Sequence, residues 1–245
     1  METLNTPPFI ETPRMTEDPI IRGIDAHKIY NSGAVTVHAL RGVSLAIPRG
    51  EMVAIMGPSG CGKTTLLNCF SGLDDLTSGD VRIEGVSLSS MNDNEKSRYR
   101  SRRMGFVFQS YNLLPVLSAV ENVELPLLVA RVPAKEARRK AVALMHHVDL
   151  DGWTDHKPAQ LSAGQQQRVA IARALVNDPA IVWADEPTGN LDSETSAQIM
   201  DLLVQLNRDQ QQTLVLVTHD TSVSSHAHRI LRMRNGQIVE ETRGG

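Results

Sequence analysis

The hydrophobic and polar positions of this chain form short apolar runs, separated by segments in which apolar residues recur at helical spacing. An apolar run of about five residues, bounded by glycine or polar residues, is typical of a buried strand. Four ranges share this pattern and are predicted as buried strands: 52–56, 104–108, 180–184 and 213–217. The range 81–85 is predicted as a further strand that ends in a turn.

Helical spacing occupies much of the chain between these strands. It predicts helices over 64–70, 117–150, 168–176 and 197–206. Near the end of the chain, Asn235 and Gly236 separate the ranges 230–234 and 237–240, and this dipeptide favours a hairpin turn. Strands that alternate with helices indicate an α/β fold with a largely parallel sheet and crossover connections.

The first 20 residues differ from the rest in composition, because they contain four prolines among threonines and acidic residues. We expect a flexible tail over 1–20 and ordered structure from about Ile21. A chain of 245 residues, 41% of them hydrophobic, can bury the core of one large domain. That domain is expected to span 21–241.

Composition and charge exclude several classes of protein. The net charge of −3 offers no basic excess for nucleic acid, so none is expected as a partner. Two cysteines make neither a disulfide framework nor a zinc spacing. Since no apolar run approaches the roughly 20 residues of a spanning helix, and no secretory signal begins the chain, any membrane contact should come through a partner.

A phosphate-binding motif follows the first predicted strand. Its pattern is G-x-x-x-x-G-K-[ST], and it stands between a strand and a helix as that motif requires. Its glycines let backbone N–H groups turn inward toward phosphate oxygens. We expect Lys63 to reach the β- and γ-phosphates of a nucleotide and Thr64 to ligate Mg²⁺. The expected nucleotide-binding residues here are Gly57, Pro58, Ser59, Gly60, Cys61, Gly62, Lys63, Thr64 and Thr65.

Two carboxylates follow the strand at 180–184. Asp185 stands at the carboxyl end of the strand, where it can hold Mg²⁺ through water. Glu186 is one residue further along and can act as the general base toward an attacking water. Together with the phosphate-binding motif, this pair predicts one shared site for nucleotide hydrolysis.

One further segment identifies a family. The run Leu-Ser-Ala-Gly-Gln at 161–165 resembles the LSGGQ signature of the ABC ATPases. Other marks of that family follow in the expected order. Gln109 resembles its Q-loop, 189–192 (Gly-Asn-Leu-Asp) its D-loop, and His219 its switch histidine, while Tyr30 resembles the aromatic residue that stacks on adenine.

The resemblance implies a fold and a mechanism. It implies a P-loop NTPase fold: a RecA-like parallel core, an antiparallel β subdomain and an inserted helical subdomain at about 110–168. It also implies ATP and Mg²⁺ as cofactors, and a dimer of two copies with ATP at the seam. ATP closes such a dimer and hydrolysis opens it. The residues expected to contact the nucleotide of the opposite copy are Ser162, Gly164, Gln165 and Asp192.

The resemblance also assigns roles within the ATPase reaction. His219 would bond the γ-phosphate and position the water, while Gln109 would contact Mg²⁺ or that water. Ser162 is predicted to cap the helix that begins at the signature. Two residues depart from the family pattern: Ala163 replaces the first glycine of the signature, and Trp183 is bulky for its strand position. Neither change removes a reactive group.

Within the family, the chain is similar to ATPase subunits of the lipoprotein-releasing and macrolide-exporting type. This likeness implies a separate integral-membrane permease and a peripheral location on the cytoplasmic face of the inner membrane. The apolar segment 110–128 is expected either to receive cytoplasmic helices of that permease or to belong to the helical core, or both. The implied function is ATP-driven export, lipoprotein release or mechanotransmission.

Two other functions fit the sequence less well. A non-transport ABC ATPase that acts on ribosomes or DNA is disfavoured, because the chain has one ATP domain, no long heptad segment and no basic excess. An unrelated phosphate-loop kinase or GTPase would leave the signature, Gln109 and His219 unexplained.

Overall fold

The computed structural model describes residues 18–33 and 35–244, so most of the predicted tail at 1–20 lies outside the described residues. Pro19 and Ile20 are buried. The sequence predicted ordered structure from about Ile21, and the packed structure begins two residues earlier, at Pro19.

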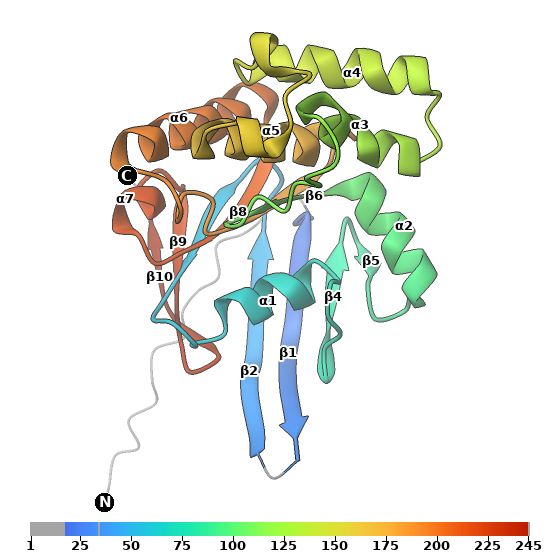
Figure 1. Cartoon of the computed structure of the whole chain (residues 1–245). Helices are drawn as coiled ribbons and strands as arrows, with labels where there is room; N and C mark the ends of the chain where they lie inside the picture. Colours follow the sequence, from blue (N-terminus) through green and yellow to red (C-terminus); the bar gives the residue numbers. More distant parts are fainter. Residues whose placement is uncertain (1–17, 34, 245) are drawn as a thin grey trace, which may run out of the picture.

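The larger sheet has six strands within the described residues, in the order β10-β9-β3-β8-β7-β6 (Figure 1). All neighbouring strands from β9 to β6 are parallel, and β10 pairs with β9 as the predicted hairpin. The four predicted buried strands and the α/β class are confirmed. The bounds are β3 Met52–Met56, β6 Met104–Phe108, β7 Ile181–Asp185, β8 Thr213–Thr218, β9 Arg229–Arg234 and β10 Gln237–Arg243.

The smaller sheet is antiparallel, with the order β2-β1-β4-β5. Its strands are β1 Ile21–Ser32, β2 Val35–Ile47, β4 Ser78–Ile83 and β5 Val86–Ser87. The sequence did not predict β1 and β2 as strands. The first four residues of β2 are exposed, and β1 shifts register against its neighbours, so neither strand has a clean apolar run or alternation.

The helices correct several predicted boundaries. The predicted helical range 117–150 contains two helices, and α5 begins at Ala163 rather than at residue 168 because Ser162 caps it. Helix α2 was missed, since none of its residues is buried and its polar sequence has no apolar stripe. The helices are α1 Lys63–Phe70, α2 Asp93–Arg103, α3 Ala119–Val129, α4 Ala134–His147, α5 Ala163–Leu175, α6 Ser193–Gln210 and α7 Thr221–Ser224.

The strands of the larger sheet are buried on both faces. Side chains alternate across a strand, so Met52 and Ala54 of β3 join one hydrophobic cluster while Val53 and Ile55 join another. The first cluster packs against α3 to α6, and the second contains α1 and the antiparallel sheet (Figure 1). Helix α1 is thereby held between the two sheets. Within the described residues, no helix has the length and apolar character needed to cross a bilayer.

Candidate active site

The predicted phosphate-binding loop joins β3 to α1. Its last residue, Gly62, has a φ of 106°, and a Cβ there would lie 2.5 Å from the carbonyl oxygen of Ala39. Only glycine fits this position. Its positive φ lets the loop curl tightly, so that the N–H groups of the loop can surround an anion. The N-terminus of α1 adds the positive end of its helix dipole at the same place.

The Lys63 ammonium group lies in this loop. The residue is buried, and its Nζ donates to the carbonyl oxygens of Gly57 at 2.8 Å and Pro58 at 3.1 Å. Neutral carbonyl oxygens are weaker partners for an ammonium group than phosphate oxygens are. The ammonium group is therefore positioned to exchange these bonds for bonds to a phosphate.

Asp185 and Thr64 meet although they are 121 residues apart in sequence. Asp185 ends β7, and the Thr64 hydroxyl in the first turn of α1 donates to its carboxylate at 3.2 Å. Burial is the main cause that raises the pKa of Asp185, and neighbouring Glu186 adds to it. Oxygen donors in a partly buried site fit Mg²⁺, because a cation would offset the cost of burying the carboxylate.

Glu186 stands beyond the end of β7 in a strained backbone position. Its φ is 48°, and its N–H donates to the carbonyl oxygen of Val217 in β8 at 2.8 Å. Its carboxylate contacts the Nδ1 atom of His219 at 2.7 Å and accepts a bond from the Thr218 hydroxyl at 3.3 Å. An ionised carboxylate only accepts, so Nδ1 donates in this pair and the Nε2 atom of His219 stays available.

Gln109 leaves the end of β6 and contacts the loop that precedes α6. The side-chain amide of Gln109 donates to the Oδ1 atom of Asn190 at 3.3 Å. The side-chain amide of Asn190 donates in turn to the backbone carbonyl oxygen of Gln109 at 2.9 Å. These two bonds join the predicted Q-loop to the predicted D-loop within one copy of the chain.

Tyr30 stands on β1 at the border of the site and is 40% exposed. Its hydroxyl donates to the Asp74 carboxylate at 2.7 Å. Partial burial, followed by the hydrogen bond to Asp74, raises the pKa of Tyr30 to about 12. The phenol therefore stays protonated at neutral pH and keeps its role as a donor.

One open cavity of about 1070 Å³ brings most of the predicted residues together: it is lined by Tyr30, residues 58–65, Gln109, Glu186 and His219. Sequence reasoning did not assign seven further lining residues to the site: Thr36, Val37, His38, Ala39, Arg41, Asn235 and Gly236. The last two were visible only as a turn signal, since nothing local relates this turn to the phosphate loop.

Six predicted residues do not line this cavity: Gly57, Asp185, Ser162, Gly164, Gln165 and Asp192. Ser162 caps α5 as predicted, with its hydroxyl oxygen accepting from the Gln165 N–H at 3.3 Å. Asp192 caps α6 by accepting from the N–H and hydroxyl of Thr195. The backbone bond from Thr195 is the main cause that lowers the pKa of Asp192.

Comparison with known proteins shows the family. Residues 40–189, more than half of the chain, match the sequence model of the family described as ABC transporter. The chain belongs to the ABC transporter family. Its fold is therefore that of the ATP-binding cassette, a P-loop NTPase.

Several relatives of this ABC cassette match along most of the chain. An uncharacterized ABC transporter ATP-binding protein of Thermotoga maritima is 52% identical, over 91% of this chain and 94% of that protein. The lipoprotein-releasing system ATP-binding protein LolD of Pseudomonas fluorescens is 45% identical, over 92% and 99%. The macrolide export ATP-binding/permease protein MacB of Syntrophobacter fumaroxidans is 48% identical, over 89% of this chain but only 31% of that protein.

A solved structure is similar throughout the cassette. It is the dimeric post-hydrolysis state of the ATP-binding cassette MJ0796, from Methanocaldococcus jannaschii, bound to ADP and inorganic phosphate. The TM-score is 0.85 and the identity 43%, over 91% of this chain and 98% of that one.

The two departures from the family pattern lie in different surroundings. Ala163 is exposed at the start of α5. Trp183 is 1% exposed and belongs to the hydrophobic cluster that contains α1. Its indole N–H has no hydrogen-bond partner in the part of the chain that the structure describes.

Proposed function

We propose that this ABC cassette hydrolyses ATP with Mg²⁺ and drives a separate membrane permease through closure and opening of a dimer of two copies. The observation that carries the proposal is one shared cavity. It holds the phosphate loop, the Glu186 carboxylate and His219 together with the adenine-side residue Tyr30.

The residues of the loop suit the binding of a nucleotide triphosphate. The N–H groups of the loop would hold phosphate oxygens, and Lys63 would exchange its bonds to the Gly57 and Pro58 carbonyls for the β- and γ-phosphates. Thr64 and Asp185 would hold Mg²⁺, directly or through water. When bound, this ion neutralises charge on the phosphate oxygens.

Glu186 suits the role of general base. Its carboxylate borders the cavity and is oriented by His219 and Thr218, so a water between it and the γ-phosphate would be aligned for attack. The water oxygen would bond to the γ-phosphorus as its proton passes to Glu186, and the bond from the γ-phosphorus to its bridging oxygen would break to release ADP and phosphate. His219 would hold the base through Nδ1 and, in the form that carries a proton on both ring nitrogens, would donate from Nε2 to the γ-phosphate.

The site on one copy is incomplete without a second copy. The signature residues Ser162 and Gly164 lie outside the cavity, at the N-terminus of a helix that offers donors to an anion. The similar MJ0796 cassette is a dimer. In the proposed dimer, this helix would face the γ-phosphate held by the other copy, so ATP would join the two copies and hydrolysis would release them.

A surface beside α2 suits the permease. A groove of about 400 Å³ runs between α2 and the segment 110–128, with Phe106, Asn112, Pro126 and Arg173 in its lining. Leu114 and Val116 of the segment are exposed, while Val120 and Val123 belong to the core. The exposed residues of the segment are accessible to a permease, while the buried ones belong to the helical core.

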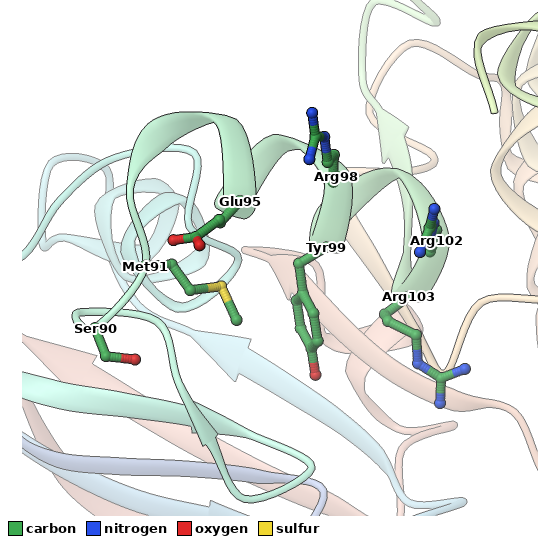
Figure 2. A pocket seen from close by; sticks show the side chains of 7 residues that line it. All are labelled: Ser90, Met91, Glu95, Arg98, Tyr99, Arg102 and Arg103. Atoms are coloured by element: carbon green, nitrogen blue, oxygen red, sulfur yellow. The ribbon is translucent and has the colours of Figure 1, made fainter.

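The other side of α2 carries a second hollow, of about 530 Å³, whose lining includes Met91 and Tyr99 (Figure 2). Arg98 and Arg102 of this lining are exposed and form no ion pair within the described residues. Helix α2 leads directly into β6, and the residue that follows this strand, Gln109, lines the cavity. A permease bound beside α2 would thus be connected to the nucleotide site through the single strand β6.

The substitution Glu186→Gln tests the proposal. We expect the ATPase rate to fall by roughly 100-fold or more, because an amide cannot accept the proton. With ATP, the variant should elute from a sizing column as a dimer that persists. Glu136→Gln, an exposed position on α4, is the matched control and should behave as wild type. Monomers with unchanged turnover would contradict the assignment.

Coupling to a permease needs a separate measurement. Co-purification with the membrane protein encoded by the adjacent reading frame should raise the ATPase rate of the cassette. Unchanged rates with that protein, in detergent and in vesicles alike, would argue for a non-transport ATPase.

A further inference from the structure

Tyr30 is fixed from two sides by residues that the ATPase reaction itself does not use. Its hydroxyl donates to Asp74 at 2.7 Å. The Lys28 ammonium lies 4.8 Å from the centre of its ring, within the range of a cation–π contact. Without these contacts, a 40% exposed tyrosine at the border of an open cavity would be free to change rotamer.

We propose that Asp74 is a positioning residue for nucleotide binding: with Lys28, it holds the Tyr30 ring as the platform on which the adenine base stacks. The inference rests on the proposed function, in which Tyr30 stacks on the base. It adds an acidic residue outside the cavity lining that sets the affinity for the base without touching the nucleotide.

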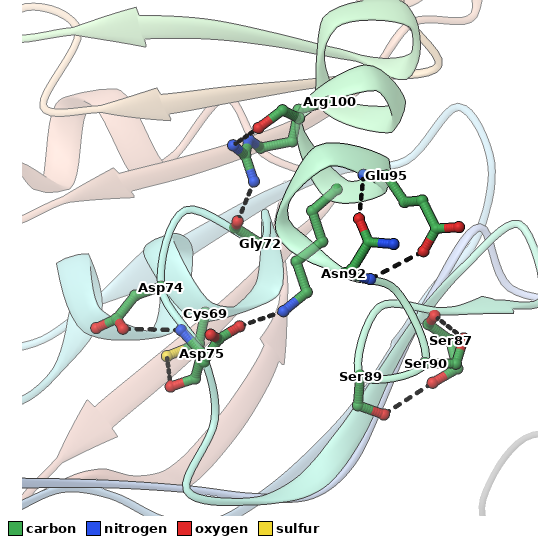
Figure 3. A network of polar contacts seen from close by, with 12 residues as sticks. Cys69, Gly72, Asp74, Asp75, Ser87, Ser89, Ser90, Asn92, Glu95 and Arg100 are labelled. Carbon is green, nitrogen blue, oxygen red and sulfur yellow. Dashed lines mark hydrogen bonds and ion pairs between the residues drawn. The ribbon is translucent and has the colours of Figure 1, made fainter.

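Asp74 is itself held firmly. One oxygen of its carboxylate accepts from Lys28 at 2.6 Å and from the backbone N–H of Asp75 at 2.7 Å, and the other accepts from Tyr30. Figure 3 includes the bond to Asp75. Burial alone would raise the pKa of Asp74, but the bonds from Lys28 and Tyr30 lower it below its usual range. A charged acceptor with this many donors makes a strong, well-oriented bond to a phenol.

The position of Asp74 relates the platform to the phosphate loop. Asp74 lies just after α1, the helix whose first turn carries Lys63 and Thr64. Helix α1 has eight residues, about 12 Å at 1.5 Å per residue. The bond between Asp74 and Tyr30 thereby connects the tyrosine to the segment that directly follows this helix.

The neighbouring residue provides a matched control. The Asp75 carboxylate pairs with Lys96 of α2 rather than with Tyr30. Asp75→Asn and Asp74→Asn make the same chemical change one residue apart. Only the second substitution removes the acceptor of the Tyr30 hydroxyl.

The test compares ADP with inorganic pyrophosphate, which has no base, by isothermal titration calorimetry on the full chain. Asp74→Asn and Tyr30→Phe should each weaken ADP binding by roughly 5-fold, since stacking of a base is a modest, separable contribution. Both should leave pyrophosphate binding unchanged. The double variant should bind ADP no more weakly than either single variant, because both remove the same bond.

GDP should be weakened as much as ADP, since a stacking platform accepts any base. The proposal is wrong if Asp74→Asn weakens pyrophosphate and ADP equally, if Asp75→Asn has the same effect, or if Tyr30→Phe binds ADP as wild type does. Tyr30→Phe keeps the test decisive should Asp74→Asn fail to fold. ADP binding needs neither a dimer nor a permease, so a failure of the proposed function would be recognised separately.

Discussion

Gly236, in the turn between β9 and β10, is predicted to support the phosphate loop from the other end of the chain. Its N–H donates to the carbonyl oxygen of Cys61 in the loop at 2.9 Å, and its own carbonyl accepts from the Arg41 N–H at 2.9 Å. The Cys61 carbonyl is thereby occupied on the side of the loop that faces the turn. That bond helps to leave the N–H groups of the loop free for phosphate.

The substitution Gly236→Ala disturbs both bonds. A Cβ at 236 would lie 2.7 Å from the carbonyl oxygen of Ala39, so the turn must move away from β2 and the loop. The φ of 78° adds a strain of about 1–2 kcal/mol for any residue with a Cβ. Loss of the two hydrogen bonds would contribute about 1–3 kcal/mol more, at the usual net value for each.

Gly85 provides the control for backbone strain. Its φ is 79°, but a Cβ at this position would meet no atom within 4 Å. Gly85→Ala therefore carries the strain of a positive φ without a displaced turn. The difference between the two variants measures the effect of the contact with Ala39 and the two bonds.

The assay is ATP hydrolysis as a function of ATP concentration, alongside urea unfolding of the same preparations. We expect Gly236→Ala to raise the KM for ATP by about 5-fold relative to Gly85→Ala, which corresponds to about 1 kcal/mol of weaker phosphate binding. Both variants should lose stability through the strained φ. Equal KM values in the two variants would refute the idea that this turn supports the phosphate loop.

Two further predictions concern stability. The bond from Arg103 is the main cause that lowers the pKa of Glu84 in the folded protein. This ion pair therefore stabilises the fold fully above the unfolded pKa of about 4.3. The stabilisation is lost as the pH falls through the lower pKa that Glu84 has in the folded protein. Thermal melts between pH 7 and pH 3 should thus show a smaller loss of stability for Glu84→Gln than for wild type; parallel curves would contradict this. Asn122→Ala should cost about 1–3 kcal/mol in urea unfolding and raise hydrogen exchange at Leu114, because buried Asn122 bonds both backbone groups of Leu114. Unchanged exchange at Leu114 would contradict the second prediction.

Local patterns were enough to predict the buried strands and the phosphate loop. The apolar runs at 52–56 and 104–108 coincide with β3 and β6, because a strand buried on both faces must be apolar throughout. Ser162 was predicted as a cap because its role depends only on residues a few positions away. The family itself follows from short motifs in a fixed order.

Other features were hidden from the sequence for physical reasons. Helix α2 buries no residue, so no apolar stripe marks it. Strand β1 carries register shifts that break its alternation. Strand β1 therefore depends on its pairing with other strands, whereas α2 is marked only at its ends, by the capping box of Asn92 and Glu95.

What the sequence by itself determined is therefore the family, the buried strands and the residue types of the site. Only the tertiary structure decided which of those residues meet. Parallel strands end at one edge of the sheet, and this brings Glu186 to His219 and Thr64 to Asp185 across long stretches of chain. The contact of Asp74 with Tyr30 has no local signal either, because it depends on how α1 packs between the two sheets.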